Sequence, residues 1–137
     1  GETGEVFRKP NSRFVADFVG TTNIFQGMST RKNGMSWVSI DDINVASTVP
    51  AEGNVYTTVR PESILVSLHP VESSARNNFR GKITNICDEG GIVKIEVDVG
   101  VPFISTITRR SYTDMELYPG KEVYITFKAT DVHLFDL

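Results

Sequence analysis

The segment Ile92-Val93-Lys94-Ile95-Glu96-Val97-Asp98-Val99 places an apolar residue at every second position. In an extended chain, alternate side chains point to opposite faces, so the apolar residues from Val93 onward share one face and the charged ones share the other. Glycine-containing turns border the segment at residues 89–91 and at Gly100. The segment therefore predicts a β-strand with one buried face.

The chain on both sides of this strand repeats the pattern. We predict further strands at residues 78–88, 102–108, 121–129 and 132–135, and one helical turn over residues 111–117. In the third of these, Val123, Ile125 and Phe127 alternate inward. Short strands joined by regular turns, without the spacing of βαβ units, indicate an all-β fold of small OB-like barrels, closed or partly open.

The first half of the chain predicts two other units. Residues 13–19 are expected to form a short amphipathic N-terminal helix, and strands are expected at 23–28, 35–40, 43–48 and 56–59, with a turn over 30–34. Met35 and Trp37 are assigned to the inward face of the second strand, with Trp37 in the core. We divide the chain into 1–20, 21–71 and 72–137, and leave open whether 21–71 forms its own barrel or completes the other.

Composition excludes several functional classes. The 137 residues carry a formal net charge of -3, which disfavours a nucleic-acid surface. No apolar run reaches the roughly 20 residues that span a bilayer, and no signal peptide is visible. The lone Cys87 is expected to be buried as a small hydrophobe, and neither Asp41-Asp42 nor the isolated His69 and His133 has ligand spacing for a metal.

Three polar pieces between Ser73 and Val132 supply a set of donors. The set consists of three hydroxyls and two cations, and no carboxylate belongs to it: Ser74, Thr108, Ser111, Arg76 and Lys128. A tetrahedral oxyanion accepts hydrogen bonds and donates none, and charged N–H donors give it the stronger bonds. Taken alone, the residues favour a simpler interpretation, in which the serines are turn and cap residues, with Ser111 capping the helical turn, and the cations are solvated.

The same pieces resemble the Mop (molbindin) domain, a small β-barrel unit of the Mop/TOBE type. The resemblance rests on Ser74-Ala75-Arg76-Asn77, on Ile107-Thr108-Arg109-Arg110-Ser111 and on Lys128-Ala129-Thr130-Asp131-Val132. It implies molybdate or tungstate as the ligand, with no cofactor and no metal cation. It also implies sites at seams between subunits, hence a homodimer through the β domain, and backbone N–H donors near Ala75.

Two other strings resemble the ATPase subunit of ABC transporters. Residues 4–20 are similar to the last segment of its ATPase domain, and Val59-Arg60-Pro61-Glu62 to its regulatory domain. This implies a cytoplasmic sensor on a molybdate/tungstate importer, inhibiting transport when oxyanion is plentiful, with an upstream ATPase domain and membrane permease subunits as partners. No phosphate loop or nucleophile–base pair occurs, so this chain is predicted not to be an enzyme. Oxyanion storage, a purely structural dimerisation module and a nucleic-acid-binding barrel are the alternatives.

Overall fold

A computed structural model describes residues 23–71 and 77–136 of the chain. The strands are β1 (Asn23–Lys32), β2 (Met35–Ile40), β3 (Ile43–Ser47), β4 (Gly53–Val59), β5 (Leu65–Ser67), β6 (Asn77–Asp88), β7 (Ile92–Asp98), β8 (Pro102–Thr108), β9 (Glu122–Phe127) and β10 (Val132–Asp136). The helices are the 3-10 turns η1 (Pro61–Ser63) and η2 (Ala129–Asp131) and the α-helix α2 (Arg109–Asp114). The predicted helix at 13–19 lies outside the described residues.

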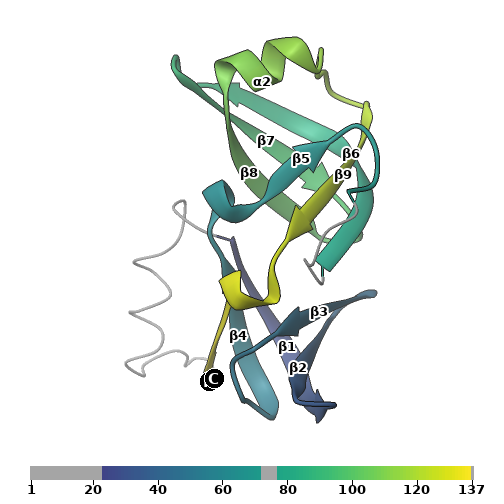
Figure 1. The fold of residues 1–137 in the computed structure, drawn as a ribbon, viewed down its shortest axis with the longest axis vertical. Helices are drawn as coiled ribbons and strands as arrows, with labels where there is room; N and C mark the ends of the chain where they lie inside the picture. The colour runs from purple at the N-terminus through teal and green to yellow at the C-terminus, as the bar shows by residue number, and fades with distance from the viewer. Residues whose placement is uncertain (1–22, 72–76, 137) are drawn as a thin grey trace.

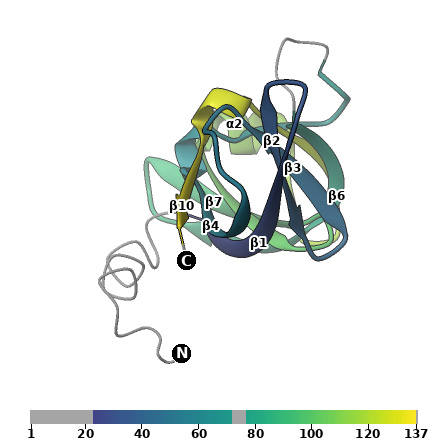
Figure 2. The same ribbon diagram turned by 90° about the horizontal axis from the view of Figure 1, so that it is seen from below.

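The strands form two five-stranded antiparallel sheets that lie one above the other along the molecule (Figure 1). The first sheet has the order β10-β4-β1-β2-β3 and the second has the order β5-β9-β6-β7-β8. Viewed along the long axis, the strands curl around a common centre (Figure 2). This arrangement confirms the all-β fold of small OB-like barrels.

The two barrels exchange strands. The last strand, β10, pairs with β4 of the first sheet, and β5 pairs with β9 of the second. The sheets therefore do not separate at residues 71 and 72, where we divided the sequence. Whether 21–71 and 72–137 act as separate domains stays a prediction.

The two halves repeat the same plan. Each runs through four strands, a 3-10 turn and a short fifth strand, and that fifth strand joins the sheet of the other half. A buried serine of each third strand donates to the chain next to the 3-10 turn of the other half: Ser47 Oγ donates to the carbonyl of Val132 at 2.7 Å, and Ser105 Oγ donates to that of Ile64 at 2.6 Å. By position in this repeat, η1 corresponds to η2, and Arg60 corresponds to Lys128.

A sequence signal for the repeat exists. The pattern Asn-x-Phe-x-Gly occurs at residues 23–27 and again at residues 77–81. A Cβ on Gly27 would lie 2.6 Å from the carbonyl oxygen of Ser39, and one on Gly81 would collide with that of Asp98. Both glycines are therefore needed where the first strand of each half passes close to a neighbouring strand.

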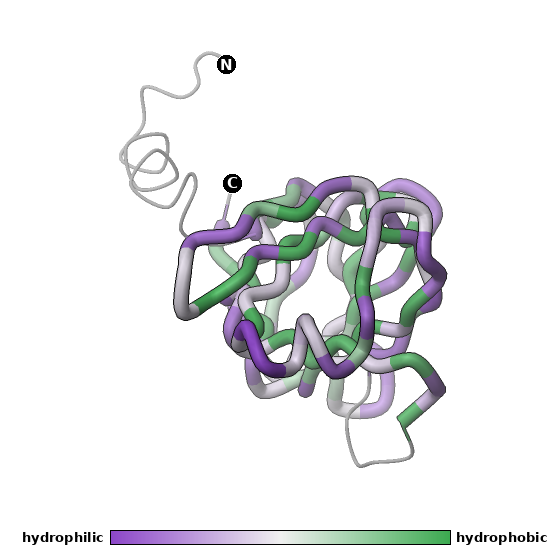
Figure 3. The backbone as a smooth tube through the Cα atoms, turned by 90° about the horizontal axis from the view of Figure 1, so that it is seen from above, coloured by the Kyte–Doolittle hydropathy of each residue, from purple (hydrophilic) through white to green (hydrophobic). Residues whose placement is uncertain are grey.

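The cores follow the alternation seen in the sequence. Hydrophobic and hydrophilic segments alternate along the strands (Figure 3), and Val93, Ile95 and Val97 are all fully buried, as predicted. Phe103 packs against Phe127 with ring centroids 5.5 Å apart. Phe25 of β1 reaches Phe103 at 4.8 Å, so the aromatic core of the second barrel extends to the first.

Strand β2 faces the opposite way from our prediction. Ser36 and Val38 are fully buried, whereas Trp37 is only half-buried and lies on the outer face. Ser36 tolerates burial because its hydroxyl donates to the carbonyl of Val49 at 2.6 Å and accepts from the N–H of Ala51 at 3.2 Å. These bonds to the loop that follows β3 offset the cost of burying a hydroxyl.

Three smaller predictions also need correction. Cys87 is exposed rather than buried, because successive residues of β6 face opposite sides and its neighbour Ile86 is the one that packs against the core. The turn expected over residues 30–34 is shorter, since β1 continues to Lys32 and only Asn33 and Gly34 adopt positive φ, at 54° and 78°. The helical turn begins at Arg109 rather than at residue 111.

Within residues 23–71 and 77–136, no helix is both long enough and apolar enough to cross a membrane.

Candidate functional site

Three of the six predicted site residues are described. Thr108, Ser111 and Lys128 lie on β8, α2 and the segment that follows β9. Ser74, Ala75 and Arg76 lie outside the described residues, so their assignment stays a prediction.

The hydroxyls of Thr108 and Ser111 lie side by side where β8 turns into α2. Thr108 is the N-cap of the helix, since its Oγ1 accepts from the N–H of Ser111 at 3.1 Å. The Thr108 hydroxyl in turn donates to Ser111 Oγ at 3.1 Å. The prediction that Ser111 caps this helix is therefore wrong: the helix begins two residues earlier, which makes Thr108 the residue just before its first turn.

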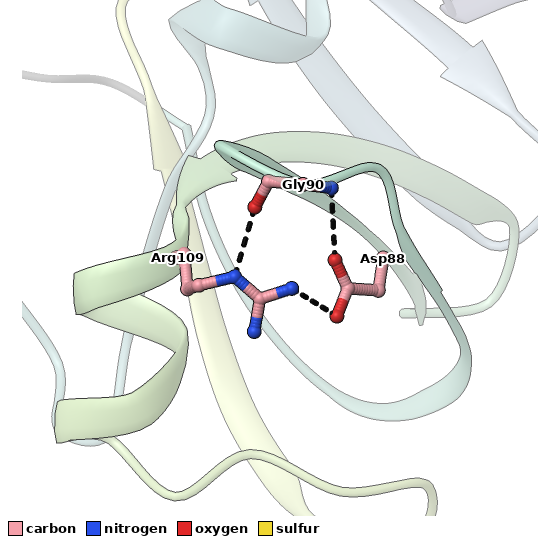
Figure 4. A network of polar contacts seen from close by, with 3 residues as sticks. All are labelled: Asp88, Gly90 and Arg109. Atoms are coloured by element: carbon pink, nitrogen blue, oxygen red, sulfur yellow. Dashed lines mark hydrogen bonds and ion pairs between the residues drawn. The ribbon is translucent and has the colours of Figure 1, made fainter.

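Arg109, between the two hydroxyls, is committed to another contact. Its Nε donates to the carbonyl of Gly90 at 2.8 Å and its guanidinium pairs with Asp88, while the N–H of Gly90 donates to the same carboxylate at 2.9 Å (Figure 4). The Gly90 N–H, and next the Arg109 side chain, hold the pKa of Asp88 below its usual value. Arg109 therefore ties the Thr108 corner to the β6–β7 hairpin and is not available as an anion donor.

Lys128 follows β9 and lies just before η2. Its side chain is exposed, and none of the hydrogen bonds or ion pairs between described residues involves it. Phe127 pairs with Asn77 across β9 and β6, so Lys128 lies beside the start of β6. This is the point at which Ser74-Ala75-Arg76 enters the strand in the sequence.

The hydroxyl pair and Lys128 lie at opposite ends of the second barrel. β6 spans the 12 residues from Asn77 to Asp88, a length of up to about 36 Å if fully extended. Lys128 lies beside its first residue, whereas Thr108 pairs with Ile92, which lies next to the far end of β6. Figure 1 shows the same separation, with α2 at one end and η2 at the junction of the two sheets. One chain does not bring these three side chains together.

Sequence reasoning overlooked one residue that the geometry makes important. Asn77 is 2% exposed, and its side-chain amide bonds to both backbone groups of Ala46 in the first barrel. The Asn-x-Phe-x-Gly repeat was the signal that would have identified it, because Asn23 occupies the same place in the first half.

Among the described residues, the three donors form no bond with a carboxylate. In the described part of the chain, no carboxylate bonds to Thr108, Ser111 or the Lys128 side chain. Nor do the described residues contain a group of three or more His, Cys, Asp or Glu side chains that could hold a metal ion. The hydroxyls of Thr108 and Ser111 and the Lys128 ammonium are therefore not engaged by a carboxylate of the described residues.

Comparison with known proteins gives one family and several relatives. Residues 73–134 match the TOBE domain. The chain is 33% identical over 136 residues to the molybdate/tungstate import ATP-binding protein WtpC of Pyrococcus abyssi, covering 98% of this chain and 38% of that protein. It is also 33% identical over 111 residues to the spermidine/putrescine import ATP-binding protein PotA of Trichodesmium erythraeum, covering 72% of this chain and 29% of that protein. The chain thus spans well under half the length of these relatives.

The fold also matches a solved structure. The cytoplasmic molybdate-binding protein ModG, crystallised with molybdate bound, superposes with a TM-score of 0.72 over 86% of this chain and 98% of that one. The two sequences are 20% identical, so the match establishes the shared fold.

Proposed function

Residues 73–134 belong to the TOBE domain family, and from this premise we propose that the chain is the oxyanion-sensing regulatory part of a molybdate/tungstate importer's ATPase subunit. The relatives named above include importers of an oxyanion and of a polyamine, which carry opposite charges. Family membership alone therefore does not fix the ligand, and the choice depends on the donor residues.

One observation carries the proposal: the elements that resemble the Mop domain present exposed hydroxyl and ammonium donors that bond to no carboxylate among the described residues. The paired hydroxyls of Thr108 and Ser111 and the uncommitted Lys128 suit an anion with four acceptor oxygens. A polyamine requires carboxylates instead, and none contacts these donors in the described residues. Arg76, with the serine and backbone donors beside it, would complete the set.

The separation of the donors supports a site shared between two chains. Because Thr108 and Lys128 lie at opposite ends of one barrel, a two-fold pair lets the Thr108 corner of one chain meet the Lys128 end of its partner. Such a pair contains two equivalent sites. Oxyanion then strengthens self-association, and by linkage the pair binds oxyanion more tightly than the single chain does.

Regulation follows from this pairing. In the whole transporter, two regulatory domains joined by oxyanion on the cytoplasmic face would hold the ATPase domains in a state that does not support transport. Reversing such an equilibrium from mostly free to mostly locked requires about 5.5 kcal/mol of differential binding, which two shared sites supply jointly. The chain itself carries no catalytic step in this proposal, because ATP hydrolysis belongs to an upstream domain.

A calorimetric titration of the chain tests the proposal. We expect molybdate and tungstate to bind, sulfate to bind much more weakly because its oxygens lie closer to the central atom, and spermidine not to bind. Spermidine binding in place of the oxyanions would assign the chain to the polyamine importers. Binding of neither would leave a purely structural dimerisation module.

A further inference from the structure

We propose that Asn77 is a positioning residue of the oxyanion site, and that the first barrel is the scaffold that holds Lys128 in place through its edge strand β3. The inference rests on the proposed function, because it concerns the same site. It assigns a role to the first barrel, which contributes none of the predicted donors.

The Asn77 side chain fixes the start of β6 to β3. The N–H of Ala46 donates to Asn77 Oδ1 at 2.8 Å, and Asn77 Nδ2 donates to the carbonyl of Ala46 at 3.1 Å. Both bonds are buried, and Ala46 is fully buried. A side-chain amide that bonds to both the N–H and the carbonyl of one residue pairs with it as a neighbouring strand would. The two bonds together fix the position of β6 relative to β3.

Two more bonds from the same strand end hold the segment around Lys128. The N–H of Thr48 donates to the carbonyl of Ala129 at 3.3 Å, and Ser47 Oγ donates to the carbonyl of Val132 at 2.7 Å. β9 ends at Phe127, so residues 128–131 lie outside the second sheet. Residues 46–48 of the first barrel therefore bond to the chain that directly follows Lys128, at Ala129 and Val132, and, through Asn77, to the strand beside it.

The repeat provides a matched counterpart. Asn23 makes the same pair of bonds to Ile104: its Oδ1 accepts from the N–H at 2.7 Å, and its Nδ2 donates to the carbonyl at 2.9 Å. Asn23 is 5% exposed. Its partner strand β8 is held along its whole length by β7, from Pro102 to Thr108, so the Thr108 corner does not depend on Asn23.

Substituting each asparagine in turn therefore distinguishes a general effect on stability from a specific effect on the position of Lys128. Each Asn→Ala substitution removes such a pair of bonds, buried at Ala46 and part-buried at Ile104, and N23A also removes a bond from Asn23 Nδ2 to the carbonyl of Val59 at 3.0 Å, so each lowers stability. Only Asn77→Ala releases the chain beside Lys128. The donors of a site must be held to a fraction of an ångström, so the affinity for oxyanion depends on this support.

The experiment compares molybdate binding by wild type, N77A and N23A, together with the thermal stability of each without ligand. We expect both variants to melt at lower temperatures, and N77A alone to lose affinity, by roughly tenfold or more, as is usual when the support of a ligand is removed. Equal affinity losses in N77A and N23A, or no loss in either, would overturn the inference. Failure of the wild type to bind molybdate would instead overturn the proposed function.

A second pair of variants, with milder substitutions, tests the inference if N77A does not fold. Ser47→Ala removes the bond to Val132 and a local bond that Ser47 Oγ accepts from the N–H of Val49 at 3.1 Å. Ser29→Ala removes a bond to a carbonyl elsewhere in the first barrel, from Ser29 Oγ to Ala51 at 2.8 Å. Both serines are buried, at 0% and 2% exposure. Weaker molybdate binding by S47A than by S29A supports the scaffold role, and equal binding by the two refutes it.

Discussion

Replacing Lys128 with methionine removes a cation with little effect on the fold. The side chain is exposed and makes no ion pair or hydrogen bond with any other described residue. Methionine keeps most of its length and apolar stem. A surface change of this kind alters the free energy of unfolding by no more than about 0.5 kcal/mol.

The effect on oxyanion binding is much larger. Loss of one charge-assisted N–H···O bond costs about 1.5–3 kcal/mol. At roughly 1.4 kcal/mol per factor of ten, this corresponds to an affinity about 10- to 150-fold lower. The two-fold pair contains the change at both of its sites, so the affinity of each site decreases.

The repeat supplies the control. Arg60 precedes η1 as Lys128 precedes η2, with backbone angles of -70° and 139° against -83° and 149°. It is also an exposed cation, so R60M changes the net charge by the same amount. Calorimetric titration with molybdate should show weak binding by K128M and wild-type binding by R60M. Equal affinities for the two variants would mean that Lys128 acts only through the overall charge, or not at all, and would refute the site assignment.

Three further outcomes are expected. The Gly90 N–H and Arg109 lower the pKa of Asp88. The stability that Asp88 contributes is therefore present above its unfolded pKa and is lost as the pH falls through its lower folded pKa. Thermal melts at acid pH should show this loss below about pH 4 in the wild type but not in D88N. A Cβ at position 81 would collide with a backbone carbonyl, whereas one at position 91 would meet nothing within 4 Å. Urea unfolding should therefore show that G81A is less stable than the wild type by about 1–3 kcal/mol and that G91A is close to the wild type. The purified chain should neither bind nor hydrolyse ATP, since its sequence has no phosphate loop, and a radiolabelled ATP assay at high protein concentration checks this.

Local alternation was sufficient to predict most of the strands. The segment from Ile92 to Val99 has one apolar face, and the structure places β7 there with that face buried. The failure at β2 has a physical reason: Ser36 is polar by type, yet its bonds to the backbone of the next loop make it a core residue. Composition alone does not reveal such bonds, because they depend on residues that are distant in sequence.

Local sequence patterns could not predict the exchange of strands between the barrels or the separation of Thr108 from Lys128. β5 has only three residues, and its pairing with β9 joins segments about 60 positions apart, for which no local pattern exists. The predicted donors come from three separate stretches of the sequence, yet only the topology shows that Thr108 and Lys128 lie at opposite ends of one barrel. The Asn-x-Phe-x-Gly repeat was available in the sequence, and it would have predicted both the duplication and Asn77.

The most direct test of a shared oxyanion site mixes two variants that each lack a different half of it. K128M removes the cation. Ser111→Glu places a carboxylate beside the anion without disturbing the helix, because Thr108 followed three residues later by glutamate forms a capping box. Each variant alone should bind molybdate weakly. If Lys128 of one chain meets Ser111 of its partner, a mixed pair contains one site with both changes and one with neither. An equimolar mixture should therefore recover tight molybdate binding, with the bound species having the mass of two chains. Weak binding by the mixture, while the wild type binds tightly, would show that each site is completed within one chain and would contradict the account.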